Sequence, residues 1–443
     1  MKIMRLRLVN LVLPLISAAV AATLAAGGCS RGGIPVVEPG GGDMSGGGNM
    51  AGGQPSPSGK LDILFMIDDS ASMAPLQAKL KTQIPAFMNS LANPATQVKP
   101  DLHVAVVSSS FGAGAWANVN QCISGSHPGD DQGKFQQGPG GSGTGACPML
   151  HAGETYLKSG DGTAANPPNF DGDLTTALTC MAMLGDSGCG FEAPFASVYY
   201  ALAKASKELG PADTLHDPDN GGFLRANAQL AVIMLTNEDD CSVASNSLLL
   251  DPAVNSVMDP TGLGALESYR CNEFGHLCAG SPPPHGFPTA IPAAGITLQS
   301  CVSAEDAGKT DPLLRDPTGA PDPTMGHLWP TVSGLADYMR SLKANPADVF
   351  LAAIAGPTVD ANGGSLYTVV PVANPTNGET DPMIAHSCTQ ETTGAPEYAD
   401  PAVRIKQLVD DFGSHGVFYP ICAADFQGSM TGIAASMRAQ LQF

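Results

Sequence analysis

Short, continuous hydrophobic runs alternate along this chain with stretches in which hydrophobic residues recur every three or four positions. A continuous run is typical of a strand buried on both faces of a sheet, and the wider spacing is typical of an amphipathic helix. The runs predict strands at 61–67, 102–108, 229–235, 348–355 and 416–421. The spacing predicts helices at 76–91, 174–184, 195–205, 332–342, 401–412 and 425–441. This alternation predicts an α/β fold, a doubly wound, mostly parallel sheet with helices on both faces.

Long segments rich in Gly, Pro, Asn and Ser interrupt the alternation at about 109–173, 243–329 and 358–400. Each is too long for an ordinary connection, so we interpret the three as insertions into one domain. The Pro and Gly density of the second predicts irregular structure. We expect an edge strand near Leu150 or Tyr156 and a hairpin at 365–372. Pro85 predicts a kink or a break in the first helix.

Polar residues follow the first strand abruptly, in the order Asp68-Asp69-Ser70-Ala71-Ser72. On an extended turn alternate residues point the same way, so Asp68, Ser70 and Ser72 converge. In open α/β sheets, ligands bind beyond the carboxyl ends of the strands. One carboxylate and two hydroxyls suit a hard divalent cation, Mg²⁺ first, with Ca²⁺ or Mn²⁺ as alternatives. The other interpretation is that Ser70 or Ser72 only caps the following helix.

The pattern D-x-S-x-S after a first buried strand resembles the metal-ion-dependent adhesion site (MIDAS) of von Willebrand factor type A (VWA) domains. The resemblance implies a VWA/Rossmann-like fold over 61–443 and a cation whose open position accepts a partner's acidic group. In that family a Gly-Thr turn before a helix and a strand ending in Thr-Asp-Gly complete the site. Here Glu192 and Asn237 stand at those two positions, with Asp239 just beyond. The candidate metal ligands are therefore Asp68, Ser70, Ser72, Asn237, Glu192 and Asp239.

Two of these positions have a second interpretation. Glu192 precedes a helix, where a carboxylate complements the helix dipole. The segment 237–240, with three acidic residues after Asn237, is also compatible with a solvated turn.

The first 60 residues have the pattern of targeting and tethering segments. Basic residues followed by a hydrophobic run predict a signal peptide at 1–28. A small residue directly before Cys29 resembles a bacterial lipobox, which implies lipidation of Cys29. The alternative is an ordinary signal peptide with an incidental Cys. The Gly-rich stretch 29–60 predicts a flexible tether. The layout resembles that of Cys-rich VWA lipoproteins of Gram-negative bacteria, which implies export and lipid anchoring to the cell envelope, in the outer membrane.

The chain has 11 Cys, and setting Cys29 aside leaves an even number. Scattered Cys in an exported acidic chain predict disulfides, here five. No C-x-x-C pair occurs, which speaks against zinc. By position we expect pairs between Cys122 and Cys147, Cys180 and Cys189, Cys271 and Cys278, and Cys388 and Cys422, with Cys241 and Cys301 remaining.

The formal charge of −20 speaks against nucleic acid and anionic membrane surfaces as partners. A bound cation would offset the repulsion between this acidic protein and another acidic group. We therefore expect a binding module, not an enzyme, whose cation bridges to a protein or glycan and whose lipid anchor alone contacts the membrane. One alternative is a metal-free, disulfide-stiffened envelope scaffold. Another is a hydrolase that pairs Ser70 with one of the nine scattered His residues.

Overall fold

The chain divides into two units, Met1–Gly53 and Gln54–Phe443. In this computed structural model the described residues all belong to the second unit: 59–114, 116, 119, 122, 131–138, 147–161, 163–207, 220–243, 247–254, 263–285, 291–304, 328, 330–373, 380–392 and 395–441. The signal peptide, Cys29 and nearly all of the expected tether lie outside them. None of the helices in the described part is both long enough and apolar enough to span a bilayer.

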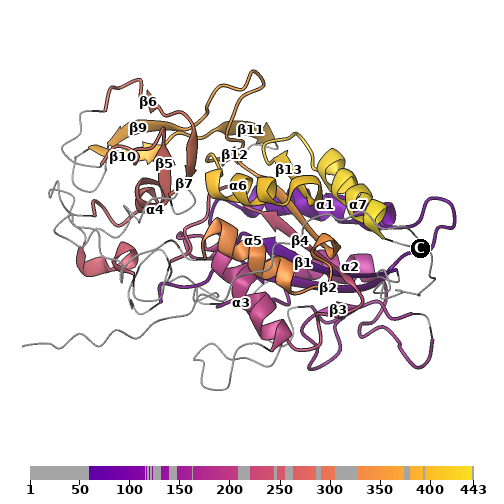
Figure 1. Ribbon diagram of the computed structural model, residues 1–443. Helices are drawn as coiled ribbons and strands as arrows, with labels where there is room; N and C mark the ends of the chain where they lie inside the picture. The colour runs from indigo at the N-terminus through magenta and orange to yellow at the C-terminus, as the bar shows by residue number, and fades with distance from the viewer. Residues whose placement is uncertain are drawn as a thin grey trace, which may run out of the picture. The chain divides into compact units, whose positions relative to one another are not determined.

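A six-stranded sheet forms the centre of the fold (Figure 1). Across the sheet the strands are β13 (Gly416–Pro420), β8 (Val349–Ala355), β4 (Gln229–Leu235), β1 (Lys60–Ile67), β2 (Asp101–Ser108) and β3 (Leu157–Lys158). All neighbours pair in parallel except β3, which lies antiparallel to β2 at the edge. The direction of winding therefore reverses between β1 and β4. In open α/β sheets a crevice forms at such a reversal, and ligands bind there.

Helices cover both faces of this sheet because successive side chains of a strand point to opposite sides. Phe65 of β1 faces one hydrophobic cluster and Leu64 faces the other. The Phe65 side packs against α1 (Ala74–Ser90), α2 (Leu174–Met181) and α7 (Gln427–Gln440). The Leu64 side packs against α3 (Pro194–Ser206), α5 (Val332–Ser341) and α6 (Val403–Asp411). The expectation of a mostly parallel α/β sheet with helices on both faces is confirmed.

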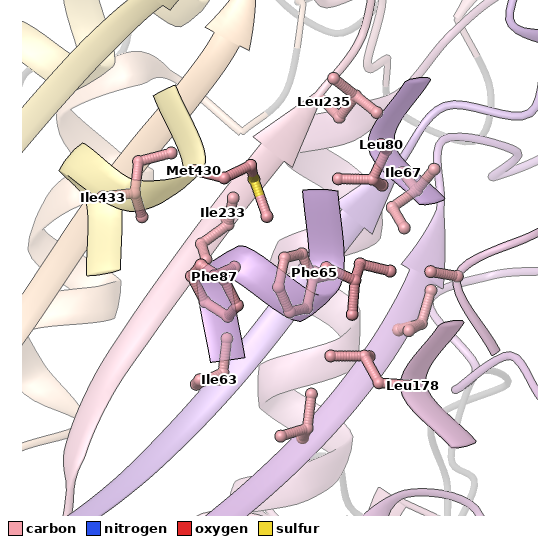
Figure 2. Close-up of a cluster of buried hydrophobic side chains, with 14 of the residues drawn as sticks. Ile63, Phe65, Ile67, Leu80, Phe87, Leu178, Ile233, Leu235, Met430 and Ile433 are labelled. Atoms are coloured by element: carbon pink, nitrogen blue, oxygen red, sulfur yellow. The ribbon is translucent and has the colours of Figure 1, made fainter. Parts of the chain in front are cut away.

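Figure 2 shows the first of these clusters, where β1, β4 and the helices α1, α2 and α7 meet. The rings of Phe65 and Phe87 pack edge to face with centroids 5.6 Å apart. Helix α1 runs through Pro85 to Ser90, so of the expected kink or break, the break is wrong. Ile84 and Phe87 on either side of Pro85 are fully buried, and their packing outweighs the hydrogen bond that proline removes.

The insertions contain more regular structure than their composition indicates. The first contributes the edge strand β3, one residue beyond Tyr156, close to the expected position. In the second, irregular stretches, as expected, separate short regular elements, which are η3 (Leu248–Leu250), η4 (Pro252–Val254), α4 (Tyr269–Gly275), β5 (His276–Cys278), β6 (Ile296–Thr297) and β7 (Cys301–Ser303). The third holds two hairpins, made by β9 (Thr368–Ala373) with β10 (Thr380–Ile384) and by β11 (Cys388–Thr392) with β12 (Ala395–Ala399). Two further short helices are η5 (Pro346–Asp348) and η6 (Gly413–His415).

Five disulfides form, as the cysteine count predicts, but most of the expected pairings are wrong. The observed pairs are Cys122–Cys189, Cys147–Cys180, Cys241–Cys271, Cys278–Cys301 and Cys388–Cys422. Only the last agrees with the pairing expected from position. Proximity along the chain misled the prediction, because contacts in the folded chain, and not the number of residues between two Cys, decide which of them pair.

The edge-to-face ring pair gives a test of this core. Replacing the fully buried Phe87 with Ala removes one ring and leaves a cavity, so the free energy of unfolding should fall by about 3–5 kcal/mol. Val98→Ala, at a side chain that is 58% exposed, should change it by less than about 0.5 kcal/mol. Chemical denaturation of both variants measures the difference, and equal effects would contradict the packing described.

Candidate metal centre

Asp68 lies where the carboxyl ends of three neighbouring strands meet. Its N–H donates to the Leu235 carbonyl at 2.9 Å, which extends the pairing of β1 with β4. Its carboxylate accepts from the Ser70 N–H at 2.8 Å, the Thr236 hydroxyl at 2.7 Å and the Ser109 hydroxyl at 3.0 Å. Burial nevertheless raises the pKa of Asp68, because these donors only partly replace water. A carboxyl group is thus held rigidly at the reversal of the sheet.

Ser70, Ser72 and Asn237 surround this carboxylate. The Ser70 and Ser72 hydroxyl oxygens are 3.4 Å apart, and the Asn237 amide lies 3.0 Å (Nδ2) and 3.1 Å (Oδ1) from the Ser72 oxygen. Helix α1 has Met73 as its N-cap, without a side-chain capping bond. The two serines therefore serve the cluster rather than the helix end. Ser72 is partly exposed, so the cluster opens to solvent on its side.

Two glutamates add negative charge to the cluster. The side chains of Glu192 and Glu238 are hydrogen-bonded to each other, which requires a proton between them. Burial raises the pKa of Glu192 well above its usual range, and the charges of Glu238 and Asp68 raise it further. Burial, with the charge of Asp400, raises the pKa of Glu238 to about 8. Glu192 Oε1 is buried without a hydrogen-bond partner among the residues described.

The position of Glu192 argues against a role at the helix dipole. It precedes Ala193, the N-cap of α3, and thus lies outside the first helical turn. Its carbonyl accepts from the Cys241 N–H at 2.8 Å, which joins the α3 turn to the segment after β4. The Glu192 side chain is 1% exposed and lines a small cavity together with Glu238.

Asp239, a candidate ligand from the sequence, makes its hydrogen bonds in a different direction. It accepts from His276 Nε2 at 2.9 Å and from the N–H groups of Arg404 at 2.9 Å and Ile405 at 3.2 Å. Burial works to raise its pKa, but the hydrogen bond and charge of His276 outweigh burial and lower it. Asp239 therefore stabilises the start of α6. Asn237, Asp239 and Asp240 are all buried, so this segment is not a solvated turn.

A second carboxylate, Asp69, fixes the loop that carries Glu192. Asp69 accepts from the Ser110 hydroxyl at 2.8 Å, and its carbonyl accepts from the Gly188 N–H at 2.7 Å. A Cβ atom at Gly188 would lie 2.4 Å from the Asp69 carboxylate, so only glycine allows this approach. Burial and the charge of Asp68 raise the pKa of Asp69 to about 7.

Two disulfides hold the loops of this cluster in place. Cys122–Cys189 closes three residues before Glu192, and the Cys189 N–H donates to the Ser110 hydroxyl at 2.8 Å. Cys241–Cys271 ties the segment after β4 to helix α4. Covalent links of this kind restrain loops that electrostatic repulsion would otherwise separate.

The structure thus brings together Asp68, Ser70, Ser72, Asn237 and Glu192. Sequence reasoning missed Glu238, Thr236 and Ser109 as members of the same cluster. Ser109 directly follows β2 and Thr236 directly follows β4, so the rule that ligands bind beyond strand ends could have found both. The sequence held no such signal for Glu238. Three acidic residues follow one another at 238–240, and the conformation of the turn decides which of them faces Glu192.

In the described ranges, no three side chains drawn from His, Cys, Asp and Glu form a group that could hold a metal ion. The candidate set here is different, because hydroxyl and amide oxygens stand beside its carboxylates. Oxygen ligands of this kind suit Mg²⁺, which usually keeps several waters and takes one or two carboxylates from the protein.

No protein-family model matches this chain, and no curated protein is significantly similar to it.

The Glu192–Glu238 pair gives a pH test in the presence of a chelator. Because its raised pKa leaves the native pair with a proton that the unfolded chain has released, the free energy of unfolding should fall as pH rises toward 8. Glu238→Gln should flatten this dependence between about pH 5.5 and 8.5, a range in which an unfolded Glu is already ionised while the native pair releases its proton. Denaturant titrations measure it, with the exposed Glu391→Gln as control. An equally steep dependence in Glu238→Gln would contradict the pairing.

Proposed function

We propose that this chain carries a VWA-like domain that binds a divalent cation, Mg²⁺ first, and through it an acidic group on a protein or glycan partner. The observation that carries the proposal is the meeting of Asp68, Ser70, Ser72 and Asn237 at the reversal of the sheet. Counted along the chain, the six strands lie in the order 3-2-1-4-5-6, which is also the order of dinucleotide-binding doubly wound sheets. That order supports the VWA/Rossmann-like relation.

The balance of charge supports a cation. Burial raises the pKa of Asp68, Glu192 and Glu238, and the charge of Asp68 raises the pKa of both glutamates further, so the cluster carries more negative charge than its surroundings stabilise. A divalent cation would supply the missing positive charge. The buried Glu192 Oε1 would then either bind the cation directly or accept a hydrogen bond from a water bound to it. Asp68, Ser70, Ser72, Asn237 and Glu192 would hold it. Ca²⁺ and Mn²⁺ are the alternatives, since both accept the same oxygen ligands.

Access to the cluster fits a bridging role. Ser72 and Glu238 are partly exposed, whereas Asp68 and Asn237 are buried. A cation held by the buried residues would keep a coordination position toward solvent. A carboxylate of the partner would take that position, and the cation would offset its repulsion from this acidic chain.

Binding fits these contacts better than hydrolysis. Ser70 is hydrogen-bonded to Asp68 and Ser72, and the buried His276 is held by Asp239 and by Tyr367 at 3.0 Å. A Ser-His-Asp triad needs the imidazole against the serine hydroxyl. We therefore propose no enzymatic activity for this site.

We also propose that the protein is exported and anchored through a lipid on Cys29, in the outer membrane of a Gram-negative bacterium. The pattern of the first 29 residues and the five disulfides, which persist in oxidising compartments, support this. The binding domain would then act at the cell envelope, at the end of the tether.

Calorimetric titration with Mg²⁺ tests the metal centre. Asp68→Asn should weaken binding by about 100-fold or more, because changes that only reorient a ligand already cost about 10–100-fold. In chelator this variant should melt at least as high as the wild type, since the amide removes a buried charge. Asp171→Asn, at an 85% exposed side chain, is the matched control.

Two results would decide against the proposal. If Mg²⁺ binds neither the wild type nor Asp68→Asn, the alternative of a metal-free scaffold is favoured. If Mg²⁺ binds wild type and Asp68→Asn alike, the cation is held elsewhere.

A charge exchange between loops tests the ligand set. Glu192→Thr should weaken Mg²⁺ binding by about tenfold, because affinity follows the number of charged ligands, and Asn237→Asp should strengthen it comparably. The double variant Glu192→Thr/Asn237→Asp keeps the charge and restores the family's residue types, so its Kd should return to within about threefold of wild type. Mg²⁺ titrations of the four proteins measure this, and a double variant that binds Mg²⁺ as weakly as Glu192→Thr would show that residue 237 is not a ligand of the same ion.

A further inference from the structure

We propose that a cavity beside the candidate metal centre is a subsite for a cationic side chain, so that the partner presents a carboxylate and an ammonium or guanidinium group close together. The cavity has a volume of about 210 Å³ and is lined by Glu267, Tyr269, Asn272, Met383 and Asp400, among others. This inference rests on the proposed function, because the cation is what would hold the partner's carboxylate.

The cavity adjoins the metal centre. It shares Asn272 and Asp400 with the smaller cavity that Glu192 and Glu238 line. The Asp400 N–H donates to the Asn237 carbonyl at 2.8 Å, which fixes this wall to the end of β4. The buried Glu192 Oε1, which lacks a partner in the described part of the chain, belongs to the same connected space. A ligand that reaches the cation therefore has the cavity within reach.

The lining suits a long side chain with a positive end. The carboxylates of Glu267 and Asp400 supply negative charge, while Tyr269 and Met383 supply apolar surface for an alkyl stem. The Tyr269 hydroxyl already donates to the Pro284 carbonyl at 2.6 Å. At about 30 Å³ per water molecule, the volume corresponds to about seven waters, enough for one lysine-sized group.

The basic side chains near the cavity, His386 and Arg270, already have partners and do not cancel its negative charge. His386 Nδ1 lies 2.8 Å from Asp400, and Arg270 donates to the carbonyls of Leu249 at 2.9 Å and Gly264 at 2.7 Å. Arg270 also lowers the pKa of Glu267, which burial and the charge of Asp381 raise. Glu267 and Asp400 thus bring two carboxylates to the lining, which contains no Lys or Arg among the residues described, and an incoming cation would balance their charge.

Apart from Gly190, the residues that line the cavity belong to the second and third insertions and not to the central sheet. Tyr269 and Asn272 belong to α4, Met383 belongs to β10, and Asp400 follows β12. The disulfide Cys241–Cys271 joins α4 to the segment after β4, so the distance between the cavity and the metal centre is covalently restrained. Preorganised walls of this kind reduce the entropy lost when a ligand binds.

Three tetrapeptides separate the contributions of the two sites. They share an aspartate and carry lysine, norleucine or glutamate as the next residue, and their binding to the full-length protein is measured by fluorescence polarisation in Mg²⁺. The lysine peptide should bind about tenfold tighter than the norleucine peptide, and the glutamate peptide weakest, because the cavity pairs charge with charge. Glu267→Gln should bring the lysine-to-norleucine ratio near one without changing the Kd for Mg²⁺.

Two further variants keep the test decisive if Glu267→Gln fails to fold. Met383→Lys changes a 40% exposed side chain and places a cation at the cavity, so it should abolish the lysine preference. Glu391→Gln, at an exposed position on β11, should preserve it. A lysine preference that survives Met383→Lys would overturn the proposal.

The remaining outcomes distinguish this inference from the metal centre. Equal binding of the lysine and norleucine peptides, or tighter binding of norleucine, overturns the cationic subsite and leaves the metal centre standing. Loss of all peptide binding in Asp68→Asn supports the bridging role. If Mg²⁺ does not bind at all, n-butylammonium chloride titrated into chelator-treated protein tests the subsite alone. It should raise the melting temperature of wild type more than that of Glu267→Gln. Equal shifts of the two melting temperatures would overturn the subsite.

Discussion

Three carboxylates, from Asp68, Glu192 and Glu238, are held within electrostatic reach of one another where the sheet reverses and little water enters. Like charges in such a place repel strongly. Burial raises the pKa of all three groups, and the charge of Asp68 raises the pKa of both glutamates further. Two hydroxyl groups and one backbone N–H donate hydrogen bonds to the Asp68 carboxylate, and the two glutamates share a proton. The fold around them is rigid enough to keep this arrangement, because β1 is buried on both faces.

The insertions and the disulfides also help to hold this arrangement of carboxylates. Cys122–Cys189 and Cys241–Cys271 restrain the loops that carry Glu192 and Glu238, and Gly188 lets one of them pack directly on Asp69. Segments dense in Pro and Gly bury little hydrophobic surface of their own. Here they fold against the carboxyl end of the sheet and build the walls of a neighbouring cavity. These long segments therefore form part of the structure around the candidate site.

In the VWA-like site that we propose, the cluster departs from the pattern of that family in a way that has a physical explanation. With Asn237 at the position of the family's Asp, one formal charge is lost, but the amide donates to the Ser72 hydroxyl and to the Tyr398 carbonyl at 3.1 Å. A carboxylate there would lose both donors. Glu192 supplies a charge from the opposite loop. The total charge available to a cation is thus retained while its distribution changes.

The sequence by itself determined the sheet and its helices, because burial on two faces or on one face is recorded in the local spacing of hydrophobic residues. It also determined the turn at Asp68, Ser70 and Ser72, whose convergence is a property of a few adjacent residues. Only the tertiary structure decided the disulfide pairs, the role of Asp239 at the start of α6, and the approach of Glu238 to Glu192. These depend on which loops meet after the sheet has formed, and contacts between residues distant in the chain leave no local pattern.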